Sequence, residues 1–142
     1  MVAQDYARAY RANAVLTASP GQLVLMLYDG ALRSLAQARE AFGRPASDLR
    51  RFEVINRHLQ KVQQIINQLQ GTLNHEAGDG QFAREMNRLY DYYTRRLFEA
   101  NLTKKVEPVV EVEQLLGEVR GAWAEMLRSH DSSREPMAHR VA

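Results

Sequence analysis

The chain has 142 residues, a length that suits one domain, and its 45% hydrophobic and 25% charged residues are typical of an ordinary folded protein. It has no cysteine, which excludes disulfides and thiolate metal sites, and its net charge of +2 is too small to favour nucleic acid as a partner. We find no signal peptide and no apolar run of membrane-spanning length, so we expect a cytoplasmic protein of the cytosol without membrane insertion.

Residues 1–18 hold Tyr6 and Tyr10 at helical spacing, followed by apolar residues that end at Leu16. This pattern can form a short amphipathic turn, but the segment is too short to be a stable helix by itself. It needs a surface to lie on, since two tyrosines are costly to leave in water. We therefore predict a short helical cap segment over 1–18; a frayed terminus is the common alternative.

A helix is predicted to begin at Pro20, because Ser19 is a good N-cap and Gln22 completes a capping box with it. The helix runs to Phe42 and carries two apolar stripes. The stripe expected to face the core comprises Val24, Leu27, Ala31, Leu35, Ala38 and Phe42. The second stripe comprises Leu23, Met26 and Gly30. Apolar residues thus surround most of the helix start, which is typical of a central core helix or of a face kept for a transient partner.

After the breaker GRPAS, Ser47 or Asp48 is expected to cap a second helix. Its apolar residues alternate three and four apart and form a heptad seam. The seam comprises Phe52, Ile55, Leu59, Val62, Ile66, Leu69 and Leu73. Val54 and Ile65 lie off this seam. An isoleucine on a polar flank is commonly the edge of a wide core, but Ile65 is the one we would test as a partner contact.

The segment NHEAGDG over 74–80 is typical of a turn that leads into a third helix, and Asn101 is its expected end. The inward face of the third helix is predicted to comprise Phe82, Met86, Leu89, Tyr90, Tyr93, Leu97 and Ala100. A fourth helix is expected to begin between Val106 and Pro108. Its seam comprises Val109, Val112, Leu116, Val119, Trp123 and Met126.

From Arg128 onward the sequence is polar and aperiodic, which predicts a disordered tail over 128–142. No strand pattern competes with the helices. Four helices with short connections and matching seams predict an all-α fold, an antiparallel up-down-up-down four-helix bundle. We expect one domain over 1–127 that includes the N-terminal cap segment.

Motifs for catalysis and for metals are missing from this sequence. A di-iron bundle needs a Glu-x-x-His repeat, and no acidic residue here has a histidine three positions later. There is no glycine-rich phosphate loop either. We therefore expect that the chain is not an enzyme and that it binds no metal and no cofactor. The basic residues of the second helix, Arg50, Arg51, Arg57 and Lys61, are interrupted by Glu53, so a nucleic-acid-binding adaptor is only a minor alternative.

Four stretches of the chain carry a family resemblance. TASPGQLVLMLYDGAL, INQLQGTLN, LYDYYTRRLFEAN and VEQLLGEVRGAW occur in this order and spacing. Together they closely resemble the flagellar secretion chaperone FliS family, from about Tyr6 to Leu127. The resemblance implies a small cytoplasmic helical bundle that binds the disordered C-terminal segment of flagellin. Such a chaperone keeps flagellin from polymerising before export and presents it to the flagellar export gate, without a cofactor.

The resemblance and the apolar patterning together suggest which residues contact the partner. They are Tyr6, Tyr10, Leu16, Leu23, Met26, Ile65, Leu69, Tyr90 and Tyr93. The segment around the first two tyrosines is a candidate lid, with which flagellin would compete. The alternative function is a helical adaptor for another protein or for nucleic acid, without flagellin specificity. Whether the free chain pairs into a homodimer stays open.

Overall fold

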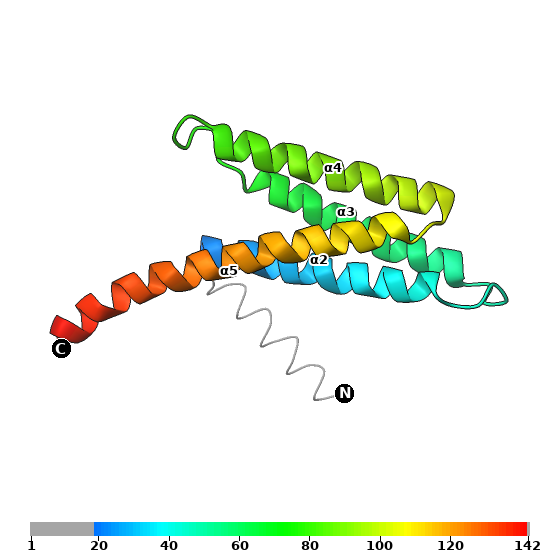
Figure 1. Ribbon diagram of the computed structural model, residues 1–142, viewed down its shortest axis with the longest axis horizontal. Coiled ribbons are helices and arrows are strands. Elements are labelled where there is room, and N and C mark those ends of the chain that lie inside the picture. Colours follow the sequence, from blue (N-terminus) through cyan, green and yellow to red (C-terminus); the bar gives the residue numbers. More distant parts are fainter. Residues whose placement is uncertain (1–18, 142) are drawn as a thin grey trace.

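Four long helices make up the part of the chain that the structure describes, namely the main chain of residues 19–141 and the side chains of residues 19–130. This computed structural model has α2 at Pro20–Phe42, α3 at Arg51–Gly71, α4 at Gln81–Thr103 and α5 at Glu107–Val141, with no strand among the described residues. Each helix packs against the next along the chain, and α5 returns to α2 and closes the bundle (Figure 1). The predicted all-α up-down-up-down four-helix bundle is confirmed.

The start of α2 follows the sequence signals in detail. The Gln22 N–H donates to the Ser19 side-chain oxygen (3.2 Å), and the Gln22 side chain accepts from the Ser19 N–H (3.3 Å). This reciprocal capping box, with Pro20 at the first helical position, satisfies main-chain donors that would otherwise lack partners. The predicted helix start is confirmed.

Two helix ends differ from the prediction. Neither Ser47 nor Asp48 caps α3; the Asp48 carboxylate instead accepts the Arg50 N–H (3.0 Å) and stabilises a turn before the helix begins. α4 passes through Asn101 and ends at Thr103, and the following residue Lys104 adopts a left-handed conformation (φ 57°). The amide of Asn101 forms hydrogen bonds to neighbouring side chains, so it does not serve as the helix terminator.

A disordered tail is predicted over 128–142, whereas the main chain of α5 is helical as far as Val141. A polar, aperiodic pattern shows only that a stretch has no face to bury, which does not require a helix to end. α5 passes through Pro136, which lacks the N–H for a helical hydrogen bond. The last turns of α5 extend beyond the other three helices (Figure 1).

The core occupies the centre of the bundle and follows the predicted seams closely. Its large fully buried side chains are Tyr28, Leu35, Ile55, Val62, Ile66, Leu69, Tyr90, Tyr93, Val109, Val112 and Leu116. Two aromatic residues were placed in it wrongly: Phe52 is 51% exposed and Phe82 is 64% exposed. Val54 and Ala83 are buried in their place. Met126 is also half-exposed, whereas Val119 and Trp123 pack against the core as predicted.

Candidate partner-binding groove

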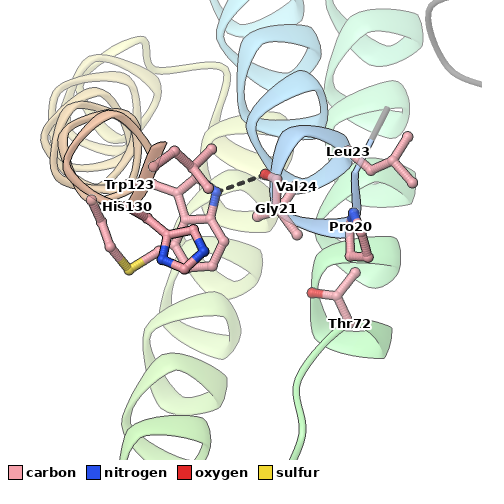
Figure 2. A pocket seen from close by; sticks show the side chains of 9 residues that line it. Pro20, Gly21, Leu23, Val24, Thr72, Trp123 and His130 are labelled. Carbon is pink, nitrogen blue, oxygen red and sulfur yellow. Dashed lines mark hydrogen bonds between the residues drawn. The ribbon is translucent and has the colours of Figure 1, made fainter. Parts of the chain in front are cut away.

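An apolar groove lies where α2 begins, between the end of α3 and the middle of α5. One hollow of about 640 Å³ is lined by Gly21, Leu23, Val24, Trp123, Met126 and Leu127, among others (Figure 2). A second hollow of about 760 Å³ is lined by Leu23, Met26, Leu27, Arg33, Gln68 and Thr72, among others. Leu23 and Thr72 line both hollows, so the two form one surface. We call this surface the α2 groove.

The wall of the α2 groove on the α5 side is fixed by Trp123. Its indole N–H donates to the Gly21 carbonyl oxygen (2.9 Å; dashed in Figure 2), and its ring meets Tyr28 edge-on with centroids 6.4 Å apart. A Cβ on Gly21 would lie 2.6 Å from a methyl carbon of Leu127, so the Leu127 side chain would have to shift to admit any larger residue. α5 therefore approaches the start of α2 closely on this side of the groove.

Three buried tyrosines lie beneath the groove. The Tyr28 and Tyr90 hydroxyls share a hydrogen bond of 2.6 Å, and both residues line a smaller hollow of about 250 Å³ next to Trp123. Burial raises the pKa of Tyr28, Tyr90 and Tyr93 above the ordinary value of 10.0. Their hydroxyls are neutral near pH 7, so this floor offers neither a charge nor an ionised nucleophile.

Charged side chains stand only at the rim of the groove. Arg120 on α5 pairs with Asp29 on α2 (2.8 Å), and Asp29 also lines the second hollow together with Arg33. Both members of the pair are more than a third exposed, so it contributes little stability. An apolar floor with a polar rim is the arrangement that receives the apolar face of an amphipathic helix.

The structure separates the predicted contact residues into three groups. Leu23 and Met26 line the α2 groove. Ile65 is half-buried on α3 and packs toward Gly30 of α2, beside the groove. The other described members, Leu69, Tyr90 and Tyr93, are at most 1% exposed and lie in the core. In this conformation they support the groove from beneath, and their direct contact with a partner stays an untested prediction.

Tyr6, Tyr10 and Leu16 lie outside the described residues, so the cap segment and its role as a lid stay predictions. Sequence reasoning missed Val24, Trp123, Met126 and Leu127 as groove residues. It assigned the first three to inward seams and left Leu127 without a role. Gly21 was the available signal, because a glycine just inside a helix start can mark a close approach of another element.

Neither a metal site nor a membrane-spanning helix occurs in the described part of the chain. No group of three or more histidine, cysteine, aspartate or glutamate side chains there could hold a metal ion. None of the helices described is long and apolar enough to cross a membrane.

Comparison with known proteins gives the family. A family profile described as "Flagellar protein FliS" matches residues 2–130. The chain is 36% identical to the flagellar secretion chaperone FliS of Bacillus subtilis (strain 168), over 94% of this chain and 95% of that protein. It is 36% identical to that of Salmonella typhimurium over 85% of this chain and 86% of that protein.

The flagellar secretion chaperone FliS of Escherichia coli (strain K12) is 33% identical, over 94% of this chain and 95% of that protein. These relatives are named as chaperones, a non-enzymatic class, which confirms the expectation that the chain is not an enzyme. The match spans α2, α3 and α4, α5 as far as His130, and the whole α2 groove. The chain belongs to the FliS family of flagellar secretion chaperones and has a chaperone role in flagellar export.

Proposed function

We propose that this chaperone binds the disordered C-terminal segment of flagellin in the α2 groove. It thereby prevents premature polymerisation and delivers flagellin to a component of the flagellar export gate. The observation that carries the proposal is the apolar surface around Leu23, which two hollows of about 640 and 760 Å³ flank. Family membership supplies the flagellar context. A chaperone that acts before export works in the cytosol, which is the location we propose.

The shape of the groove supports a helical ligand. An amphipathic segment that folds on binding places apolar residues at i, i+3 and i+4 into such a surface. Ordering a disordered segment costs several kcal/mol, so the apolar contacts must exceed that cost and the net affinity stays moderate. Moderate affinity suits a chaperone, because the cargo must be released at the export gate.

Calorimetric titration with a C-terminal flagellin fragment tests the proposal. We expect the fragment to bind, and Leu23→Glu to weaken binding by at least about tenfold, because it places a charge in the apolar floor. Leu49→Glu is the matched control, since Leu49 is 95% exposed and lies outside the groove. Circular dichroism checks that both variants stay folded. Unchanged affinity in a folded Leu23→Glu variant would remove the α2 groove as the site.

The effect on polymerisation has its own assay. Seeded flagellin polymerisation, followed by light scattering, should slow when the wild-type chain is added in equimolar amount. The Leu23→Glu variant should leave the rate close to that of flagellin alone, because the two activities share one surface. A variant that loses binding but still suppresses polymerisation would separate the two parts of the proposal.

A further inference from the structure

A second apolar surface lies where α3 begins and α4 ends. It comprises Leu49, Phe52, Phe98 and Leu102, which are 95%, 51%, 69% and 72% exposed. We call it the distal patch, because in an antiparallel bundle this end is opposite to the end that holds the start of α2. A single exposed leucine needs no explanation, but four large apolar side chains on adjoining turns of two elements do.

Hydrogen bonds hold the two helices together at the distal patch. The Asn101 amide of α4 donates to the Asn56 side-chain oxygen of α3 (2.9 Å). Thr94, further back on α4, accepts from Gln63 of α3 (3.1 Å). Phe98 lies four residues after Thr94 and three before Asn101, so helical register places it on the same edge of α4. Phe98 therefore borders the seam between α3 and α4.

Phe52 forms the α3 side of the distal patch. The Lys104 ammonium nitrogen lies 5.2 Å from the centroid of its ring, and the Arg51 guanidinium carbon lies 5.3 Å from it. The Lys104 ammonium group also donates to the Asn101 side-chain oxygen (2.6 Å). The end of α4 thus reaches across to Phe52, which joins Phe98 and Leu102 on one helix to Phe52 and Leu49 on the other.

The charges around the distal patch are unbalanced. Arg51 and Lys104 lie against Phe52, and neither forms an ion pair with a carboxylate among the described residues. The nearby acids are already used. Glu53 pairs with Arg50 (3.9 Å) and Glu99 pairs with Arg96 (2.6 Å). An apolar strip that carries two cations without acidic partners complements a ligand that is apolar on one face and acidic on its flanks.

We propose that the distal patch docks an acidic amphipathic helix of a second protein, separately from the export cargo. Two apolar residues one turn apart on α4, facing a third across the seam, match the i and i+4 anchors of a helix laid in a groove. A second copy of this chain fits less well. A two-fold contact would bring the same patches together and oppose like charges around Arg51 and Lys104.

The position of the distal patch allows it and the α2 groove to be occupied at the same time. The α2 groove and the distal patch lie at opposite ends of the bundle and share no lining residue. One chaperone can therefore hold its cargo and the second protein at the same time. The inference does not depend on the identity of the cargo, because it rests only on the exposure and charge of the distal patch.

The test uses a defined probe, a synthetic amphipathic helix of roughly 18 residues with leucines at i, i+4 and i+7 and glutamates on the flanks. Its twin carries lysines in place of the glutamates. Binding of each fluorescent peptide to the full chain is measured by anisotropy at low salt. The acidic peptide should bind at least about fivefold tighter than its twin, and added salt should reduce the difference. Equal binding of the two peptides would overturn the proposal.

Variants then locate the site. Phe98→Ser with Leu102→Ser should weaken binding of the acidic peptide by about tenfold. Phe82→Ser, which also removes an exposed phenylalanine from α4, is the matched control and should bind as wild type. Lys104→Glu should remove most of the preference for the acidic peptide, because Lys104 lies beside Phe52. Retained affinity in the folded serine double variant would overturn the proposal.

Two further measurements exclude other occupants. Sedimentation of the wild-type chain should show no dimer that the serine double variant loses. Vesicles with anionic lipid should not retain the wild-type chain more than that variant. A dimer that only the wild-type chain forms would assign the distal patch to self-association and refute the proposal. Stronger vesicle binding by the wild-type chain would assign it to a lipid surface and also refute the proposal. The same serine variant should bind the flagellin fragment as wild type does, so this test and that of the proposed function fail independently.

Discussion

The three buried tyrosines beneath the α2 groove should respond differently to loss of their hydroxyls. Tyr93 is 0% exposed, and its hydroxyl has no hydrogen-bond partner among the described residues. A buried hydroxyl without a partner costs about 1–3 kcal/mol of desolvation. Tyr93→Phe removes only that hydroxyl and keeps the ring contacts. We expect it to raise the free energy of unfolding by about 1 kcal/mol.

Tyr28 and Tyr90 should show the opposite behaviour, because their hydroxyls bond to each other at 2.6 Å. Tyr28→Phe leaves the Tyr90 hydroxyl buried without a partner, and Tyr90→Phe does the same to Tyr28. Each single change should lower the free energy of unfolding by about 1–3 kcal/mol. The double variant removes both hydroxyls and leaves neither unpaired. Its loss should be smaller than the sum of the two single losses, by about 1–2 kcal/mol.

Urea unfolding followed by circular dichroism measures all four variants. A change in stability at constant denaturant slope shifts only the midpoint, so the slopes serve as a check. One kcal/mol corresponds to about 3 °C in melting temperature for a domain of this size. The reasoning is refuted if Tyr93→Phe destabilises by about 1 kcal/mol or more, which would show that its hydroxyl has a partner. Additive losses at Tyr28 and Tyr90 would refute their coupling.

Alkaline pH gives an independent readout of the same residues. Burial raises the pKa of all three tyrosines above 10.0 in the folded chain, so above pH 10 the unfolded chain binds fewer protons than the folded one. Stability then falls as pH rises, by about 1.4 kcal/mol per pH unit for each residue and about 4 for three. The stability that is lost in this way is fully present below about pH 10. Tyr93→Phe should reduce the slope by about a third.

Three further changes test the turn, the lid and the flank of the groove. Gly80 has φ 75° and a Cβ there would lie 2.7 Å from a main-chain carbonyl oxygen, whereas Gly78 has φ 57° and open space. In urea unfolding, Gly80→Ala should cost about 1–2 kcal/mol more than Gly78→Ala, and equal losses would count against the clash. If residues 1–18 form a reversible lid, Tyr6→Ala with Tyr10→Ala should keep or raise calorimetric affinity for the flagellin fragment. A clear drop would indicate direct contact instead. Ile65→Glu should weaken that binding with a melting temperature only a few degrees lower, whereas a large loss of stability with intact affinity would place Ile65 in the interior.

Most of the fold follows from local signals that the sequence carries. Ser19 and Pro20 fix the start of α2 because their chemistry suits only those positions. Helical periodicity located the seams, but it does not distinguish two neighbours that both match the spacing. Phe82 and Ala83 lie four and three residues before Met86, and side-chain size favoured the phenylalanine. The alanine is the buried one, at 2% exposure, whereas Phe82 is 64% exposed.

The candidate site was predicted only in part. Leu23 and Met26 were identified because more apolar residues surround the start of α2 than one core can cover. Trp123 was assigned to an inward seam, and its ring does pack against the core. The sequence pattern cannot show where the facing helix ends, so it did not reveal that Trp123 also lines the groove. Leu69 and Tyr93 entered the predicted site through the family resemblance, and their near-complete burial shows that these positions also serve the core.

One hollow of the α2 groove lies where the shorter α2 begins beside the longer α5. α5 has 35 residues and α2 has 23, which correspond to about 53 and 35 Å of helix. α2 begins at Pro20, close to the point where Trp123 and Leu127 of α5 reach Gly21. Trp123, Met126 and Leu127 of α5 line one hollow together with residues at the start of α2. The open end of α2 therefore provides a place for one more helical segment, from the cap segment or from the cargo.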